Sequence, residues 1–128
     1  MTAGALSRGV IGVVISGLCR DLSEHSLLHF PVFSRGHSTL GQSPFTRTSE
    51  VNIPLHIAPI YPDLAERVTV LPEDWIVADE DGVVCVPRVL ELDAIQLAEA
   101  GKRVDDFCLK DIRSGRPIQD TFQTYRGK

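Results

Sequence analysis

The sequence predicts an α/β fold in which a strand-rich N-terminal block precedes C-terminal helices. Up to residue 87, apolar side chains occur in short runs rich in valine and isoleucine, bounded by glycine, proline and acidic turns, as strands do. From Arg88 onward they recur every three or four residues, which is typical of helices with one apolar face. With 128 residues, 43% hydrophobic and 23% charged, the chain fits a single soluble domain over residues 1–128.

The first predicted strand, Val10–Ile15, is a continuous apolar run and therefore needs cover on both faces. The helices after residue 88 could cover one face. Because only a short segment precedes the strand, we expect cover of the other face from a longer form of the chain or from a neighbouring subunit. After a turn, Asp21 and Glu24 match the N-cap and N3 positions of a helix start. This helix should end before Pro31, and a strand is expected over Pro31–Arg35.

Residues 36–50 are rich in glycine, serine, threonine and proline and predict a long loop, of the kind that is more often functional or subunit-contacting than idle. Further strands are expected at Val51–Ile57, Val68–Leu71, Trp75–Ala78 and Val83–Val86. Pro59–Arg67 is a connection, and Asp79–Gly82 is an acidic turn that joins the last two strands in a hairpin.

The C-terminal third predicts helices. An apolar helical face over residues 89–98 leads to Gly101, which can cap the end of that helix. The helical pattern continues from Val104 to Gly115, and Pro117 fits the first turn of a last short helix.

Charge and cysteine content exclude several classes of protein. Thirteen basic residues against 17 acidic ones give a net charge of −4, whereas nucleic-acid binding needs concentrated lysine and arginine. The three cysteines show no zinc-ligand spacing, and their odd number favours a reducing compartment, the cytoplasm. Near the start, the longest apolar run is far shorter than the ~20 residues that cross a membrane. We therefore expect neither nucleic acid nor membrane as a partner.

The residues best placed for chemistry are Arg20 and Asp21, which follow the first strand at the end where α/β sheets bind ligands. An aspartate can hold a hard divalent ion, and an arginine binds a carboxylate through two parallel hydrogen bonds. The alternative is structural: Asp21 caps a helix, and Arg20 is its solvent-facing neighbour. The acidic run Asp79–Asp81 is more simply a solvated turn than a metal site.

Several segments, in order, resemble the RraA-like family. This family contains the regulator of ribonuclease activity A, the class II 4-hydroxy-4-methyl-2-oxoglutarate aldolases, which also decarboxylate oxaloacetate, and DlpA-like proteins. The similar segments are Gly9–Ile15, Gly17, Arg20-Asp21, Phe30–Gly36, Glu50–Pro54 and Asp74–Pro87. The resemblance implies a swivelling β/β/α-type domain, assembled as a homotrimer or hexamer with the active site at a subunit interface.

The same resemblance implies roles for three residues. Arg20 corresponds to the catalytic arginine that contacts the substrate, and Asp21 to the aspartate that binds Mg²⁺ or another divalent metal ion. Glu24 matches an acidic position that supports metal-bound water. The family's Gly-rich loop, with a further aspartate that binds the oxo acid, and its N-terminal helices and first strands are expected to lie outside this chain. The position before Gly17 is often aspartate in the family and is Ser16 here.

The expected function is that of a divalent-metal-dependent carbon–carbon lyase of the cytoplasm. It would cleave 4-hydroxy-4-methyl-2-oxoglutarate by a retro-aldol reaction and decarboxylate oxaloacetate to pyruvate, so its partner is a small 2-oxo acid. Two alternatives stay open because the substrate loop is absent: a non-catalytic regulator that binds a ribonuclease, and an inactive truncated homologue. Release of pyruvate from oxaloacetate with added Mg²⁺ would separate the enzyme from the inactive homologue.

Overall fold

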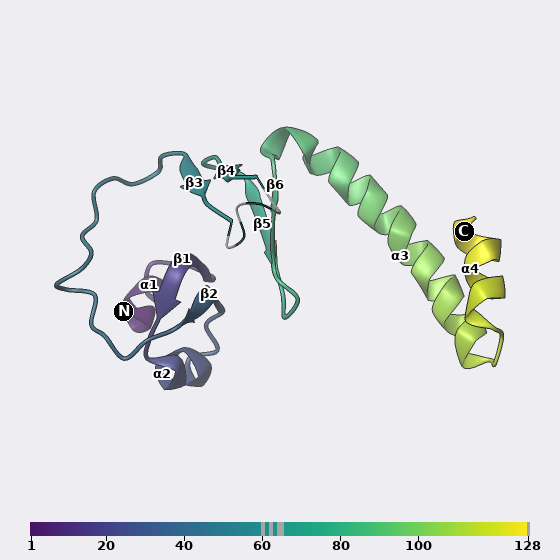
Figure 1. Cartoon of the computed structure of the whole chain (residues 1–128), viewed down its shortest axis with the longest axis horizontal. Helices are drawn as coiled ribbons and strands as arrows, with labels where there is room; N and C mark the ends of the chain where they lie inside the picture. Colours follow the sequence, from purple (N-terminus) through teal and green to yellow (C-terminus); the bar gives the residue numbers. More distant parts are fainter. Residues whose placement is uncertain (60, 62, 64–65, 128) are drawn as a thin grey trace. The chain divides into compact units, whose positions relative to one another are not determined.

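The computed structural model has the predicted order of elements, with strands followed by C-terminal helices (Figure 1). It describes residues 1–59, 61, 63 and 66–127. The chain divides into two units, Met1–Cys85 and Val86–Lys128, and each is described by itself. The first unit holds all the described strands in three two-stranded sheets, and the second holds the long C-terminal helices.

The first sheet pairs β1 (Val13–Cys19) with β2 (Val32–His37) in parallel, and α2 (Leu22–Leu27) connects them. The register runs from Val13 opposite Val32 to Cys19 opposite His37, with a bulge between Ile15 and Leu18. Because parallel strands need a crossover, the short helix predicted before Pro31 is the connection that this pairing requires.

A helix that the apolar pattern did not reveal, α1 (Thr2–Leu6), precedes β1. The Thr2 side chain is buried, and its Oγ1 lies 2.7 Å from Nδ1 of His25 in α2. This hydrogen bond links α1 to α2, so the first residues of the chain belong to the structure around the first sheet.

The first strand lies further along the chain than predicted. Residues 10–12 are outside it, and it continues through Gly17 to Cys19 instead of ending at Ile15. Pairing begins where the Val13 N–H donates to the carbonyl of Pro31 (3.0 Å), immediately before β2 starts. The bounds of a strand depend on where a neighbouring strand offers hydrogen bonds. An apolar run in the sequence does not indicate which residues have such a partner.

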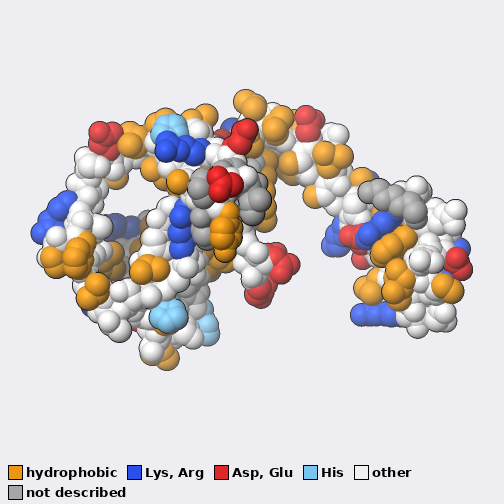
Figure 2. Space-filling model, in the orientation of Figure 1, with side chains coloured by type: hydrophobic (Ala, Val, Ile, Leu, Met, Phe, Trp, Pro, Cys, Tyr) orange, Lys and Arg blue, Asp and Glu red, His pale blue; other side chains and the backbone are white. Residues whose placement is uncertain are grey.

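Among the described residues, one face of this strand is at least partly covered and the other face is exposed. Val14 is 48% exposed and Leu18 is 60% exposed, whereas Cys19 and Phe30 are buried. Figure 2 shows apolar side chains reaching the surface in both units. The expectation that cover for one face must come from elsewhere agrees with this exposure.

The second sheet pairs β3 (Leu55–Ile57) with β4 (Val68–Val70) in antiparallel register. The predicted strand Val51–Ile57 is wrong in its first half, because Asn52 has a left-handed backbone (φ +58°) and Pro54 has no N–H to donate. The loop predicted at 36–50 therefore runs from 38 to 54. The predicted connection Pro59–Arg67 lies partly outside the described residues.

The third sheet is the predicted hairpin of β5 (Trp75–Ala78) and β6 (Val83–Val86). In its turn, Oδ1 of Asp79 accepts the N–H groups of Asp81 (2.9 Å) and Gly82 (3.3 Å). Gly82 has φ +157°, which L side chains rarely adopt. The first carboxylate of the acidic run thus holds the turn, as the structural interpretation predicts.

The C-terminal unit consists of a 3₁₀ turn η1 (Arg88–Leu90), the long helix α3 (Glu91–Arg113) and α4 (Ile118–Arg126). The predicted helix end at Gly101 is wrong, because α3 runs through it without a break. A glycine inside a helix costs about 1 kcal/mol relative to alanine, which strong helix formers on both sides outweigh. None of the described helices has the length and apolar character needed to cross a membrane.

Helix α4 lies beside the C-terminal end of α3 (Figure 1). Cys108 and Thr121 are buried at this contact, and the rings of Phe107 and Tyr125 stack with centroids 5.6 Å apart. Asp111 accepts hydrogen bonds from Arg116 Nη1 (2.8 Å) and from the Tyr125 hydroxyl (3.1 Å). These contacts stabilise the two-helix hairpin from inside its own unit.

Candidate functional site

Arg20 and Asp21 form the short link between the end of β1 and the start of α2. Nε of Arg20 donates to Oδ2 of Asp21 over 3.0 Å, and both side chains are about half exposed. The structure therefore places the guanidinium and the carboxylate against each other, and it leaves both open to a ligand at the carboxyl end of a parallel strand.

Asp21 occupies the N-cap position of α2, but its carboxylate makes no capping hydrogen bond. Instead, its backbone carbonyl accepts the N–H groups of Glu24 (2.9 Å) and His25 (3.2 Å). The backbone of Asp21 is left-handed (φ +62°, ψ 39°), a conformation that aspartate tolerates better than most residues. The structural alternative therefore holds for the position of Asp21, which is the N-cap residue of α2, but the helix does not use its carboxylate.

Glu24 lies in the first turn of α2, on the same short segment as Asp21. Its Oε1 is 3.7 Å from the amino group of Met1, and its side chain is 39% exposed. Among the residues that the structure describes, no cluster of three His, Cys, Asp or Glu side chains could hold a metal ion. A cation here would therefore depend on one or two carboxylates and on water, which is the way Mg²⁺ is commonly bound.

The loop after β2 lies beside the end of β1 and Arg20. The N–H of Ser38 donates to the carbonyl of Cys19 (2.8 Å), which extends the pairing of β1 and β2 beyond the strands. Three residues later, a Cβ atom placed on Gly41 would lie 3.4 Å from Nη1 of Arg20. The sequence predicted a functional loop here, but only the structure shows which of its residues meets Arg20.

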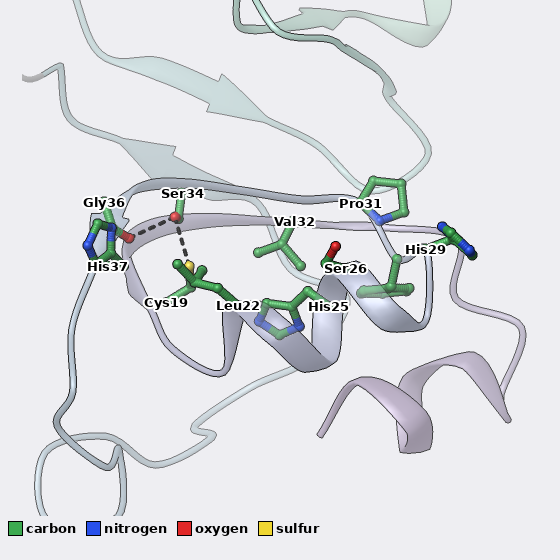
Figure 3. A pocket seen from close by; sticks show the side chains of 11 residues that line it. Cys19, Leu22, His25, Ser26, His29, Pro31, Val32, Ser34, Gly36 and His37 are labelled. Carbon is green, nitrogen blue, oxygen red and sulfur yellow. Dashed lines mark hydrogen bonds between the residues drawn. The ribbon is translucent and has the colours of Figure 1, made fainter.

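A separate pocket of about 570 Å³ lies between α2 and the first sheet (Figure 3). Within it, Oγ of Ser34 donates to the carbonyl of Gly36 (2.8 Å) and lies 3.2 Å from Sγ of Cys19. Figure 3 shows His37 and His29 at opposite ends of the pocket. None of the predicted site residues lines it, so this pocket is not the predicted site.

Cys85 lies in β6 beside Asp74. Burial, together with the neighbouring Asp74 carboxylate, raises the pKa of its thiol. Oδ2 of Asp74 lies 3.7 Å from Sγ of Cys85 and also accepts the N–H of Leu71 (2.8 Å). A raised pKa keeps the thiol protonated and a poor nucleophile, as expected of a small structural residue.

Comparison with known proteins supports the resemblance on which the site assignment rests. The 33% identical protein named "Putative 4-hydroxy-4-methyl-2-oxoglutarate aldolase" from Halalkalibacterium halodurans aligns over 102 residues, 80% of this chain and 44% of that protein. Protein DlpA of Legionella pneumophila is 25% identical over 126 residues, 98% of this chain and 19% of its own length.

A solved structure shows the same fold. The crystal structure of an uncharacterized protein from Pseudomonas syringae pv. tomato superposes with a TM-score of 0.86 at 30% identity, covering 98% of this chain and 55% of that one. This chain thus spans about half the length of the solved relative and of the Halalkalibacterium protein. The sequence model of the RraA-like family, described as Aldolase/RraA, matches residues 1–85, the segment that contains β1, Arg20, Asp21 and all but the last residue of the hairpin. With 85 of its 128 residues matched, the chain belongs to the RraA-like family.

Proposed function

We propose that this chain carries the substrate- and metal-binding residues of a divalent-metal-dependent carbon–carbon lyase. Its reactions would be retro-aldol cleavage of 4-hydroxy-4-methyl-2-oxoglutarate and decarboxylation of oxaloacetate to pyruvate. The observation that carries the proposal is the Asp21 carboxylate, which does not cap α2, lies beside Arg20 and is half exposed. The name of the Halalkalibacterium relative supports the substrate class.

The residues present fit a hard divalent ion such as Mg²⁺. Asp21 offers a carboxylate that the helix does not use, and Glu24 offers a second one in the same turn, as a partner for metal-bound water. Mg²⁺ keeps several water molecules and commonly binds through one or two carboxylates, so two acidic residues suffice. When bound, the ion would act as a Lewis acid that draws negative charge away from the breaking carbon–carbon bond.

Arg20 would bind the substrate carboxylate. Its Nε is engaged by Asp21, so the two terminal nitrogens are the atoms that can face a carboxylate in parallel. Retro-aldol cleavage and oxaloacetate decarboxylation both leave the enolate of pyruvate, and the positive charge of Arg20 would stabilise it. One set of groups can therefore serve both reactions.

We further propose that residues 1–128 act as one RraA-like domain in a cytoplasmic homotrimer or hexamer. The exposed apolar side chains of β1 support self-association, since large apolar surfaces mark sites of protein contact. The three cysteines are free thiols, which supports a reducing compartment.

Binding of oxalate, a planar analogue of the pyruvate enolate, tests the proposal directly. Calorimetry should show binding that requires Mg²⁺, weakened about tenfold or more by Arg20→Lys, because lysine keeps the charge but loses the planar fork. The exposed Arg103 in α3 provides a matched control, and Arg103→Lys should bind like the parent.

Turnover then separates the lyase from the alternatives. Pyruvate release from oxaloacetate should exceed the rate with Mg²⁺ alone and should fall in Arg20→Lys. A rate equal to that of Mg²⁺ alone, together with intact oxalate binding, would favour an inactive homologue. Absence of both binding and turnover would favour a non-catalytic regulator of a ribonuclease.

A further inference from the structure

The loop between β2 and β3 is tied to the end of β1 beside Arg20. The Ser38 N–H donates to the carbonyl of Cys19, the residue before Arg20 (2.8 Å). The Ser38 hydroxyl oxygen then accepts the N–H of Leu40 (3.1 Å), which bends the chain back immediately before Gly41. Two hydrogen bonds therefore bring Gly41 to the site.

The guanidinium of Arg20 is bounded by two neighbours. On one side its Nε donates to Oδ2 of Asp21 over 3.0 Å. On the other, Nη1 faces Gly41, where an added Cβ would lie 3.4 Å away, an ordinary contact distance. A methyl group fits at this position, whereas a β-branched side chain fills two of the three directions beyond its Cβ and so crowds the guanidinium.

The backbone gives no reason for a glycine at position 41. Gly36 and Gly82 have φ +157°, a value that other residues rarely adopt, whereas Gly41 is not among the residues with positive φ. What Gly41 provides is space. The atom near Gly41 is the far end of the flexible, half-exposed Arg20 side chain. A larger residue at position 41 would therefore displace Arg20 and leave the fold intact.

We propose that Gly41 is a positioning residue for Arg20: its missing side chain keeps the guanidinium against Asp21 with its terminal nitrogens turned to the carboxylate of a 2-oxo acid. The identity of residue 41 thereby sets the affinity for the substrate. This inference rests on the proposed function, because it takes Arg20 as the group that binds the carboxylate.

Substitutions at position 41 should affect ligand affinity and leave stability unchanged. In the presence of Mg²⁺, Gly41→Val should raise the dissociation constant of oxalate about tenfold, the loss expected for one hydrogen bond to a charged group. Gly41→Ala should remain close to the parent because a methyl group fits. Gln42→Val, a matched change at the next, exposed position of the loop, should have no effect. The thermal unfolding midpoint should be the same in all three variants.

A double-mutant cycle tests whether Gly41 acts through Arg20. Arg20→Ala should weaken oxalate binding, and adding Gly41→Val to it should cause no further loss. The inference is wrong if the fold-losses in oxalate affinity of the two single variants multiply in the double variant. It is also wrong if Gly41→Val binds oxalate like the parent.

The position of Arg20 can also be followed without a ligand. The Nε–H signal of Arg20 in nuclear magnetic resonance spectra should shift in Gly41→Val and not in Gln42→Val, because its hydrogen bond to Asp21 is disturbed. If the signal shifts but the parent binds no oxalate, the positioning role holds and the proposed function fails. An unchanged signal would overturn the positioning role by itself.

Discussion

Asp21 adopts a left-handed backbone conformation that costs a typical L residue roughly 1–2 kcal/mol. A capping hydrogen bond from its side chain to α2 would offset this free-energy cost, but none is formed. The carboxylate instead accepts a hydrogen bond from the adjacent, half-exposed Arg20. Strained residues of this kind gather at functional sites, where the surrounding structure maintains them. At the scale of single residues, Asp21 thus combines a left-handed backbone with a carboxylate that the helix does not use.

Replacing Asp21 by asparagine should separate these two roles. Asparagine also tolerates the left-handed region, so the stability should change by about 1 kcal/mol or less. The lost negative charge should abolish Mg²⁺ binding, and with it Mg²⁺-dependent pyruvate release. Calorimetric titration with Mg²⁺ and thermal unfolding measure the two effects separately.

The control for this substitution is Asp79→Asn, because Asp79 is also an aspartate in a turn but uses its carboxylate to accept backbone N–H groups. That variant should bind Mg²⁺ like the parent. Mg²⁺ binding that survives in Asp21→Asn would show that Asp21 is not the metal-linked carboxylate.

The sequence pattern located Asp21 correctly at the start of a helix, but it did not determine whether the carboxylate caps that helix. An aspartate three residues before a glutamate indicates a helix start, and α2 does begin there. Whether the carboxylate caps the helix depends on the backbone conformation of Asp21, which its residue type does not determine. The contact between Gly41 and Arg20 was beyond sequence reasoning for a related reason, because it depends on how Ser38 joins the end of β1.

At the scale of elements, predictions succeeded where both ends of a segment carry local signals. The hairpin of β5 and β6 has its predicted bounds because Asp79 and Gly82 mark the turn and Pro87 ends the second strand. The predicted bounds of β1 were wrong because they depend on its pairing with another strand. The predicted helix end at Gly101 was wrong because the helix formers on both sides of this glycine outweigh its unfavourable helix propensity.

The hairpin of α3 and α4 provides a prediction about pH. The hydrogen bond from Arg116, with a further one from Tyr125, lowers the pKa of Asp111 below its ordinary value of 3.8. A carboxyl whose pKa is lowered by folding stabilises the folded state above that ordinary value, and the stabilisation is lost as the pH falls below it. Thermal unfolding followed from about pH 7 to about pH 3 should therefore show a loss of helix stability at the acid end.

The substitution Asp111→Asn should lower the stability near neutral pH and reduce this acid dependence. Asp106, exposed on the same helix, supplies the control: Asp106→Asn should leave the acid dependence as in the parent. Equal pH profiles for Asp111→Asn and the parent would show that the Asp111–Arg116 pair does not stabilise the hairpin.

At the scale of the whole molecule, the exposed apolar surface is the dominant feature. Few described side chains are buried, whereas many large apolar ones are exposed, Leu18 of β1 at 60% among them. Surfaces of this kind favour contact between chains because association removes apolar area from water. The fold class, and the need of the first strand for apolar neighbours on its faces, could be predicted from the sequence because both follow from the order of the apolar runs.

We therefore expect oligomers at micromolar concentration, measured by light scattering. The substitution Leu18→Glu places a charge on β1 and should shift the distribution toward smaller species. Val51→Glu, a matched change at an exposed apolar residue in the loop before β3, should shift it less. A monodisperse monomer for the parent chain would refute the expectation.

The parallel pairing of β1 and β2 has a consequence for how this site could diversify. Because both strands run in the same direction, both end at one edge of the sheet, and each is followed there by a connection. The first connection carries Arg20 and Asp21, while the second is the long loop from 38 to 54. Under the proposed function, the groups for chemistry and the groups for selectivity would lie in separate stretches of sequence. We expect that the loop beyond Gly41 could then change in length or sequence, and with it the shape of the acid that fits, while the register of β1 and β2 that positions Arg20 stays the same.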